Sequence, residues 1–144
     1  MISYNSTQLW VHDQDVALDF YTNKLGMVVR SDVSPPEMGG FRWLSVGPEH
    51  QPDISIVLMK IPGEPVMDEA TRVKVEELMG KGFAGFLFLT TEDLDATYAE
   101  LTARGIEFVE KPSDEPYGRD SSFRDPSGNH IRLMTPFSMG PNGS

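Results

Sequence analysis

The sequence predicts an α+β fold of two βαβββ modules, which form a curved mixed sheet around a central groove with the helices outside. First, a strand, a helix and three further strands follow one another twice along the 144 residues. Second, the two copies align on Asp13 and Asp93, about 80 residues apart, each just before a helix. Third, a glycine stands where each helix ends, Gly26 in one copy and Gly105 in the other. One such module leaves a sheet face uncovered, so we expect the two to pair.

The first copy starts with a strand in which apolar and polar residues alternate, the pattern of a sheet with one buried face. Asp13 then opens a helix whose apolar stripe includes Val16, Phe20 and Leu25. A Gly-Pro pair separates the last two strands and indicates a hairpin. The expected strands are residues 7–11, 27–33, 41–47 and 53–60.

The second copy repeats this order, with Leu94, Tyr98 and Leu101 along one side of its helix. Its last two strands flank Asp-Pro-Ser-Gly-Asn at 125–129, which is typical of a tight turn. Asp125 is expected to accept hydrogen bonds from main-chain amides of this turn. The expected strands are residues 86–90, 106–110, 119–124 and 129–134.

A Pro/Gly-rich linker and a third helix separate the two copies. This helix has a weakly periodic apolar set, Val73, Val75 and Leu78. The last residues, SMGPNGS, have the composition of a disordered tail. The predicted divisions are a first module at 1–62, a linker and helix at 63–82, a second module at 83–137 and a tail at 138–144.

The composition excludes several classes of protein. Hydrophobic residues make up 39% and charged residues 24%, as in soluble globular domains, and no apolar run approaches the roughly 18 residues of a membrane span. Without cysteine there are no disulfides, thiolate nucleophiles or Cys-ligated metals. The first residues lack the basic start and apolar run of a secretory signal, so we expect a cytoplasmic location.

The formal net charge of −10 bears on the partners of the protein. Nucleic-acid binding depends on clustered Lys and Arg, which this acidic chain does not offer. A cationic small molecule is attracted by such a field. Alternatively, the excess of acidic residues serves solubility alone. The expected partner is a small molecule, and neither a nucleic acid nor a membrane.

Two motifs together resemble a known family. D-x-x-x-A-x-x-F-Y-x-x-x-L-G begins at Asp13, and R-D-P-x-G-N begins at Arg124. With the strands around them, they resemble the vicinal oxygen chelate superfamily over residues 5–135. This group includes glyoxalase I, extradiol dioxygenases and bleomycin-resistance proteins. The resemblance implies paired βαβββ modules, often in a homodimer, and in its enzymes a divalent metal bound in the groove by His, Gln or Glu.

The ligand positions that the resemblance implies are not occupied by metal-binding residues in this chain. Ser6 and Phe86 stand near the start of the first strand of each half, and Arg132 stands where the family's last strand carries a glutamate. The strand at 54–59 offers no ligand of the usual type. A phenyl ring cannot coordinate a metal, and a guanidinium repels it. We therefore expect no metal and no cofactor in the groove.

Aromatic and polar side chains alternate on the strand faces that are predicted to line the groove. Such a lining suits a planar ligand held by stacking, with Arg132 pairing with an acid group or His130 donating a hydrogen bond. Alternatively, the rings of Trp10, Phe86 and Phe88 fill the groove as core. Trp43 stands on another strand and could lie on either of its faces. The candidate ligand-binding residues are Gln8, Trp10, Trp43, Phe86, Phe88, Tyr117, His130 and Arg132.

His130 is the candidate for general acid–base chemistry, because the ordinary imidazole pKa of about 6.5 suits proton transfer near neutral pH. No partner for it is identifiable in the sequence, so a structural role is the alternative. His12 and His50 are expected in turns or exposed loops.

Three functions stay open. The leading one is a glyoxalase/bleomycin-resistance-like protein without the usual metal ligands, a homodimer that binds a small aromatic or cationic ligand in its groove. The second is a lyase, isomerase or dioxygenase of the same superfamily that uses a displaced metal, or His130 with Arg132. The third is a structural dimer module whose groove is filled.

Overall fold

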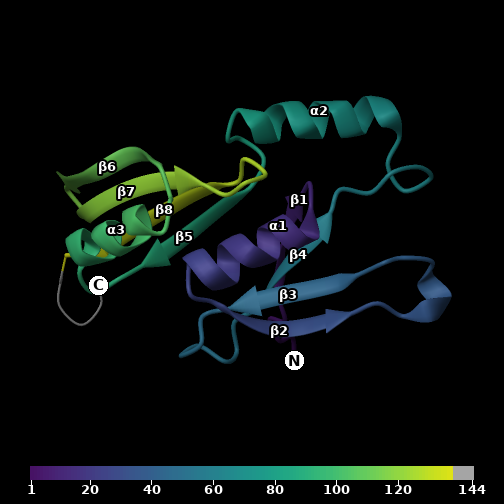
Figure 1. Cartoon of the computed structure of the whole chain (residues 1–144), viewed down its shortest axis with the longest axis horizontal. Helices are drawn as coiled ribbons and strands as arrows, with labels where there is room; N and C mark the ends of the chain where they lie inside the picture. The colour runs from purple at the N-terminus through teal and green to yellow at the C-terminus, as the bar shows by residue number, and fades with distance from the viewer. Residues whose placement is uncertain (138–144) are drawn as a thin grey trace.

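Residues 1–137 of the computed structural model form two four-stranded sheets, three α-helices and two shorter helical segments (Figure 1). Each sheet is built from the strands of one copy of the repeat. The tail predicted at 138–144 lies outside the described residues. None of the helices within residues 1–137 is both long and apolar enough to cross a membrane.

The first sheet has the strand order β1-β4-β3-β2. Strands β1 and β4 are parallel, and the other neighbours are antiparallel. Its elements are β1 (Thr7–Val11), α1 (Gln14–Asp19), the π-helical segment η1 (Phe20–Lys24), β2 (Val28–Val33), the 3₁₀ turn η2 (Pro36–Met38), β3 (Trp43–Gly47) and β4 (Ile56–Lys60).

The second sheet repeats this topology, with the order β5-β8-β7-β6 and a parallel β5–β8 pair. The α+β class and the two βαβββ modules are therefore confirmed. The remaining elements are the connecting helix α2 (Glu69–Gly80), β5 (Phe86–Thr90), α3 (Leu94–Ala103), β6 (Phe108–Glu115), β7 (Gly118–Arg124) and β8 (His130–Pro136).

The helix boundaries agree with the repeated Asp and Gly signals. The Asp13 side chain accepts from the amides of Asp15 and Val16 at the start of α1, and Asp93 caps α3 in the same way. Gly26 and Gly105 both have positive φ, 78° and 94°, which glycine adopts without a steric penalty.

The first helix departs from a regular α-helix after Asp19, where η1 begins. The amide of Leu25 bonds to the carbonyl of Phe20, five residues back, so this turn is wider than an α-helical one. Two consecutive rings, Phe20 and Tyr21, are both buried here. Both rings belong to the apolar stripe that the sequence predicts, whereas the wider turn that carries them is not indicated by the sequence.

Two further elements differ from expectation. Strand β6 continues through Pro112 to Glu115, because β6 is an edge strand and a proline there removes no hydrogen bond from the interior of the sheet. In α2 the predicted apolar face is wrong: Val73 and Leu78 are half-exposed, and Met79 is the buried residue.

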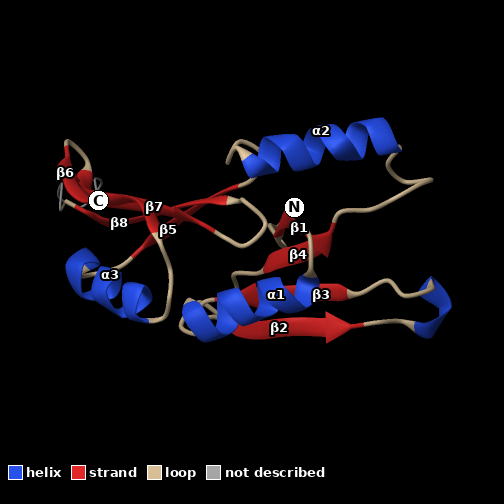
Figure 2. Cartoon of the chain, turned by 45° about the horizontal axis from the view of Figure 1, so that its top comes forward, coloured by secondary structure: helices blue, strands red, loops and turns tan. Residues whose placement is uncertain are grey.

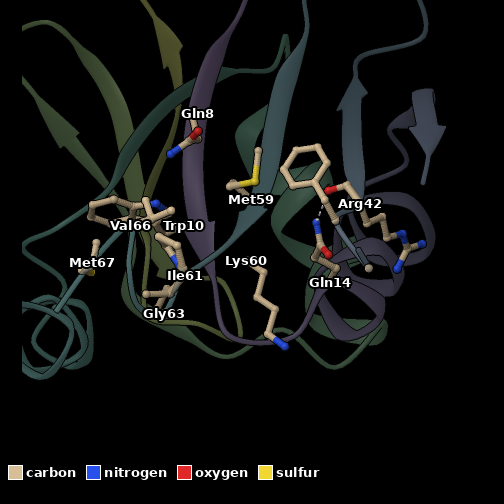
Figure 3. A pocket seen from close by; sticks show the side chains of 13 residues that line it. Gln8, Trp10, Gln14, Arg42, Met59, Lys60, Ile61, Gly63, Val66 and Met67 are labelled. Atoms are coloured by element: carbon tan, nitrogen blue, oxygen red, sulfur yellow. Dashed lines mark hydrogen bonds between the residues drawn. The ribbon is translucent and has the colours of Figure 1, made fainter. Parts of the chain in front are cut away.

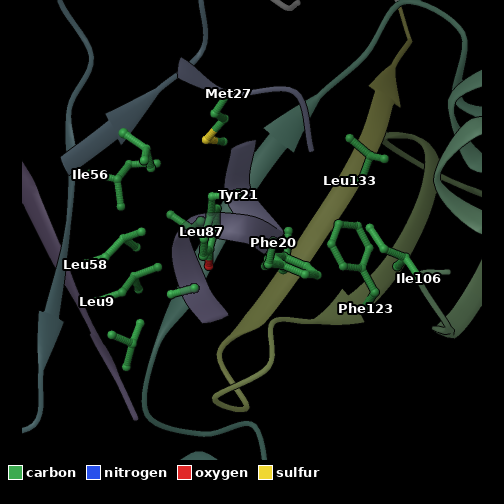
Figure 4. Close-up of a cluster of buried hydrophobic side chains, with 14 of the residues drawn as sticks. Leu9, Phe20, Tyr21, Met27, Ile56, Leu58, Leu87, Ile106, Phe123 and Leu133 are labelled. Carbon is green, nitrogen blue, oxygen red and sulfur yellow. The ribbon is translucent and has the colours of Figure 1, made fainter. Parts of the chain in front are cut away.

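The buried apolar side chains of both modules form one cluster. Figure 2 shows α1 against the first sheet and α3 against the second. Phe20 and Tyr21 lie between Leu58 of the first sheet and Phe123 of the second (Figure 4), and the ring centroids of Phe20 and Phe123 are 6.3 Å apart. The helix-covered faces of both sheets therefore share the core, and the opposite faces carry the candidate groove residues.

Candidate functional site

In the first module, the candidate residues of β1 point away from the shared core. Gln8 and Trp10 alternate with buried Leu9 and Val11. Register places Trp10 beside Met59 of β4. Trp43 lies on the same face. Ser45 of β3 pairs with Val57 of β4, which pairs with Gln8 of β1, and Trp43 is two residues from Ser45 along β3. The sequence alone left the face of Trp43 open.

A cavity of about 690 Å³ lies against this face (Figure 3). Its volume falls within the range of roughly 300–1,000 Å³ that is usual for small-molecule sites. Gln8 and Trp10 are the predicted site residues that line it, and Trp43 is not among its lining residues. The other lining residues are Gln14, Gly40, Phe41, Arg42, Met59, Lys60, Ile61, Pro62, Gly63, Val66 and Met67.

Hydrogen bonds hold the polar side chains at one end of this cavity. The Gln14 amide donates to the carbonyls of Arg42 and Leu58, at 3.0 and 2.9 Å. The Arg42 guanidinium contacts both Asp32 oxygens, at 2.9 and 3.0 Å, and also Asp15. The hydrogen bond from Arg42 lowers the pKa of Asp32. Gln14 and Arg42 thus stabilise the end wall, and the charge of Arg42 is already paired.

In the second module, β5 and β8 place four candidate residues side by side. Phe86 pairs with His130 and Phe88 with Arg132, on the face opposite buried Leu87. Phe88 is 72% exposed and Phe86 is 49% exposed. Within this chain the two rings therefore do not fill a core.

A polar cluster continues this second wall from Arg132. Its Nε lies 3.0 Å from Asp120 Oδ2, and its Nη1 lies 3.1 Å from Glu110 Oε1. Tyr117 donates its hydroxyl to the same Asp120 oxygen at 2.6 Å, and Ser122 donates to Glu110 at 2.8 Å. Arg132 thus already binds two carboxylates, which leaves it poorly suited to the predicted pairing with an acid group of a ligand.

The charge state of this cluster follows from its contacts. Burial alone would raise the pKa of Asp120, but the hydrogen bonds from Arg132 and Tyr117 outweigh it and lower that pKa. The hydrogen bond from Ser122, and then that from Arg132, lowers the pKa of Glu110. Burial and the charge of Arg132 lower the pKa of His130. At neutral pH two carboxylates face one guanidinium beside a neutral imidazole, so the wall has a negative excess.

Comparisons with known proteins agree with this architecture. The sequence model of the Glyoxalase/Bleomycin resistance protein/Dioxygenase superfamily matches residues 3–133. The chain belongs to this superfamily. It is 31% identical over 129 residues to the uncharacterized protein YurT of Bacillus subtilis (strain 168), covering 89% of this chain and 94% of that protein.

Two crystal structures are similar to this superfamily member. UcmS2 is 39% identical with a TM-score of 0.82, and the match covers 93% of this chain and 98% of UcmS2. TnmS3, an antibiotic binding protein from Streptomyces sp. CB03234, is 33% identical with a TM-score of 0.70, covering 94% of this chain and 98% of TnmS3.

The side chains at the positions where the resemblance implies metal ligands are not of the types that bind a divalent ion. Phe86 packs on His130 with ring centroids 5.4 Å apart, and the guanidinium of Arg132 lies between the two carboxylates of the cluster. Within residues 1–137, no three His, Asp or Glu side chains are grouped so that they could hold a metal.

Several residues of the site were not among those predicted from the sequence. Met59 could have been found, because it alternates along a strand that pairs with β1. Val66 and Met67 lie in the Pro/Gly-rich linker, whose composition indicates only a connection. Glu110 and Asp120 meet Arg132 across β6, β7 and β8, and β6 has register shifts on both sides of Glu110 that no sequence pattern indicates.

Proposed function

We propose that this superfamily member binds a small aromatic organic ligand and needs no metal ion to do so. The observation that carries the proposal is the pair of walls with accessible rings, Trp10 over the cavity of the first module and Phe86 with Phe88 on the second. Aromatic side chains around a few fixed polar groups are the usual lining of a ligand site. The likeness to TnmS3, described as an antibiotic binding protein, supports the same class of function.

The charge of the second wall favours a neutral or cationic ligand over an acidic one. Asp120 and Glu110 outnumber Arg132, and Glu110 is more than half exposed. A ligand cation placed near Glu110 meets an attractive field, which salt would weaken. The long-range field has the same sign, because the net charge is −10.

The two walls also support a homodimer. They lie on the sheet faces that point away from the shared core, so each has an uncovered side within one chain. A second copy would place its second-module wall over the first-module wall of its partner and enclose a groove from both. A cytoplasmic location stays a prediction that cell fractionation would test.

Two dyes with the same ring and opposite charge test the ligand proposal. 9-Aminoacridine is a planar cation and acridine-9-carboxylate is a planar anion. Calorimetric titration at low salt should show the cation binding about tenfold more tightly, which is about 1.4 kcal/mol. Glu110→Gln should reduce this preference, and Trp10→Ala should weaken both dyes while Trp43→Phe does not. Absence of binding by either dye, or a preference for the anion, contradicts the proposed ligand class.

The metal and enzyme alternatives are separated with the same protein. Binding of 9-aminoacridine should be unchanged after dialysis against a chelator. A stoichiometric divalent ion that the binding requires would contradict the metal-free proposal. Turnover of a catechol or of the methylglyoxal–glutathione adduct, lost in His130→Gln, would instead favour a dioxygenase or lyase.

The dimer is tested by placing a charge on the second wall. Phe88→Glu buries a carboxylate in the proposed interface, which is costly without a partner, so we expect a single-chain mass by sedimentation equilibrium where the original protein shows two chains. Phe83→Glu is the matched control, because Phe83 is similarly exposed, at 68%, but precedes β5 and is not on the wall. A single-chain mass for the original protein would contradict the dimer.

A further inference from the structure

The turn between β7 and β8, residues 125–129, is bonded both within itself and to the first module. Asp125 Oδ1 accepts from the amides of Ser127 and Asn129, both at 2.9 Å, as the sequence predicts. Its Oδ2 accepts the Tyr21 hydroxyl at 2.7 Å and the Asn129 side-chain amide at 2.8 Å. Tyr21 belongs to η1, so this buried carboxylate joins the two modules.

The same turn holds the main chain of β1 on both sides of Val11. The Asn129 side-chain amide donates to the carbonyl of Trp10 at 2.9 Å, and the amide of His12 donates to Ser127 Oγ at 3.0 Å. Asn129 is 1% exposed, so its side-chain amide cannot replace these hydrogen bonds with bonds to solvent. The acceptor is the carbonyl of the same residue whose indole lines the cavity.

The turn is itself held firmly from the other side. The amide of His130 donates to the carbonyl of Gly85 at 2.8 Å, just before β5. Gly128 has a φ of 97°, and a Cβ there would lie 2.1 Å from the carbonyl oxygen of Met79 in α2. Arg124 donates to the last carbonyls around α2, at Gly80 and Lys81. Movement of the turn therefore requires movement of β5 and α2.

We infer that Asn129 and Tyr21 are positioning residues of the ligand site. Through the turn they hold β1, and with it the Trp10 indole, in a fixed position relative to His130 and Arg132 on β8. Neither residue lines the 690 Å³ cavity, although Asn129 lines a smaller one of about 220 Å³ beside Trp10. Their effect on the larger cavity is therefore transmitted through the Trp10 main chain. The consequence for ligand affinity rests on the proposed function, whereas the consequence for the position of Trp10 does not.

The indole signals of the two tryptophans test the inference. In ¹⁵N-labelled protein, assigned with Trp43→Phe, Asn129→Ala should shift or broaden the Trp10 indole peak and leave the Trp43 peak in place. Ser121→Ala is the matched control, because it removes a buried 2.8 Å hydrogen bond to Leu133 within the second sheet alone. It should leave both peaks in place. Where Asn129→Ala does not fold, Tyr21→Phe takes its place with the same expected shift.

Ligand affinity is measured on the same variants. Asn129→Ala should bind 9-aminoacridine about tenfold more weakly than Ser121→Ala of comparable stability. An unmoved Trp10 peak in a folded variant overturns the positioning inference. A shifted Trp10 peak in a protein that never binds the dye leaves the inference standing and contradicts only the proposed function.

Discussion

Arg132→Met is expected to lower the free energy of unfolding by roughly 2 to 4 kcal/mol at pH 7, because Asp120 loses its cation while it stays buried. The Asp120 side chain is 2% exposed and Arg132 is 27% exposed. Removing one partner of a fully buried pair costs about 3–5 kcal/mol, and the partial exposure of Arg132 lowers that figure. Methionine preserves most of the apolar stem, so lost packing contributes little.

The loss in Arg132→Met should depend on pH in a defined direction. In the original protein the pKa of Asp120 is lowered, which stabilises the fold at pH values above the ordinary aspartate pKa of about 3.9. This stabilisation is lost as the pH falls through the lowered pKa. In the variant, burial without the Arg132 hydrogen bonds raises that pKa, so Asp120 takes up a proton as the pH falls. The difference between the two proteins should therefore be largest near pH 7 and shrink towards pH 4, as measured by urea unfolding.

Arg119→Met is the control for this prediction. Arg119 lies on the same sheet and also contacts two carboxylates, Asp95 and Asp114, at 3.0 Å. These partners are 64% and 74% exposed, and exposed pairs contribute little to stability. We expect no measurable change in its urea midpoint. Equal losses in the two variants, or a loss in Arg132→Met that persists at pH 4, would contradict the account of the cluster.

The sequence predicts the modules well because each of their boundaries has a local physical signal. Asp13 and Asp93 cap helices through their own side chains, and Gly26 and Gly105 supply positive φ where the helices end. Strand alternation likewise separates the half-buried Trp10 and the exposed Phe88 from the buried Leu9, Val11 and Leu87 beside them. These signals require no knowledge of which strands are neighbours.

The rest of the candidate site depends on contacts between distant segments. Arg132 could be read as free to pair with a ligand, because only the pairing of β6 with β7 and of β7 with β8 brings Glu110 and Asp120 to it. The cavity likewise needs Val66 and Met67 of the linker to line it together with Trp10 and Met59, and no residue pattern in a linker specifies its path. For the same reason Asn129 could be identified as a turn residue but not as a donor to Trp10.

Asp125→Ala is expected to cost roughly 3–5 kcal/mol of folding stability, because the buried carboxylate accepts four hydrogen bonds. The Tyr21 hydroxyl would be left buried without an acceptor, and two main-chain amides of the turn would lose theirs. Each such group costs about 1–3 kcal/mol, and because all belong to one network their effects do not simply add. Since the two modules share one core, the loss should appear as one shifted transition in thermal and urea unfolding.

Asp93→Ala is the matched control, since Asp93 also accepts a main-chain amide but does so at the exposed start of α3. It should cost about 1 kcal/mol, the usual effect of losing a helix cap. The variants should also differ in alkali. Burial, and then the charge of Asp125, raises the pKa of Tyr21, so stability is lost as the pH rises above the ordinary tyrosine value of about 10. Without the charge of Asp125 this alkaline loss should be smaller, whereas Asp93→Ala should lose stability in alkali as the original protein does. An alkaline loss of the same size in Asp125→Ala would contradict the effect of the Asp125 charge on the Tyr21 hydroxyl.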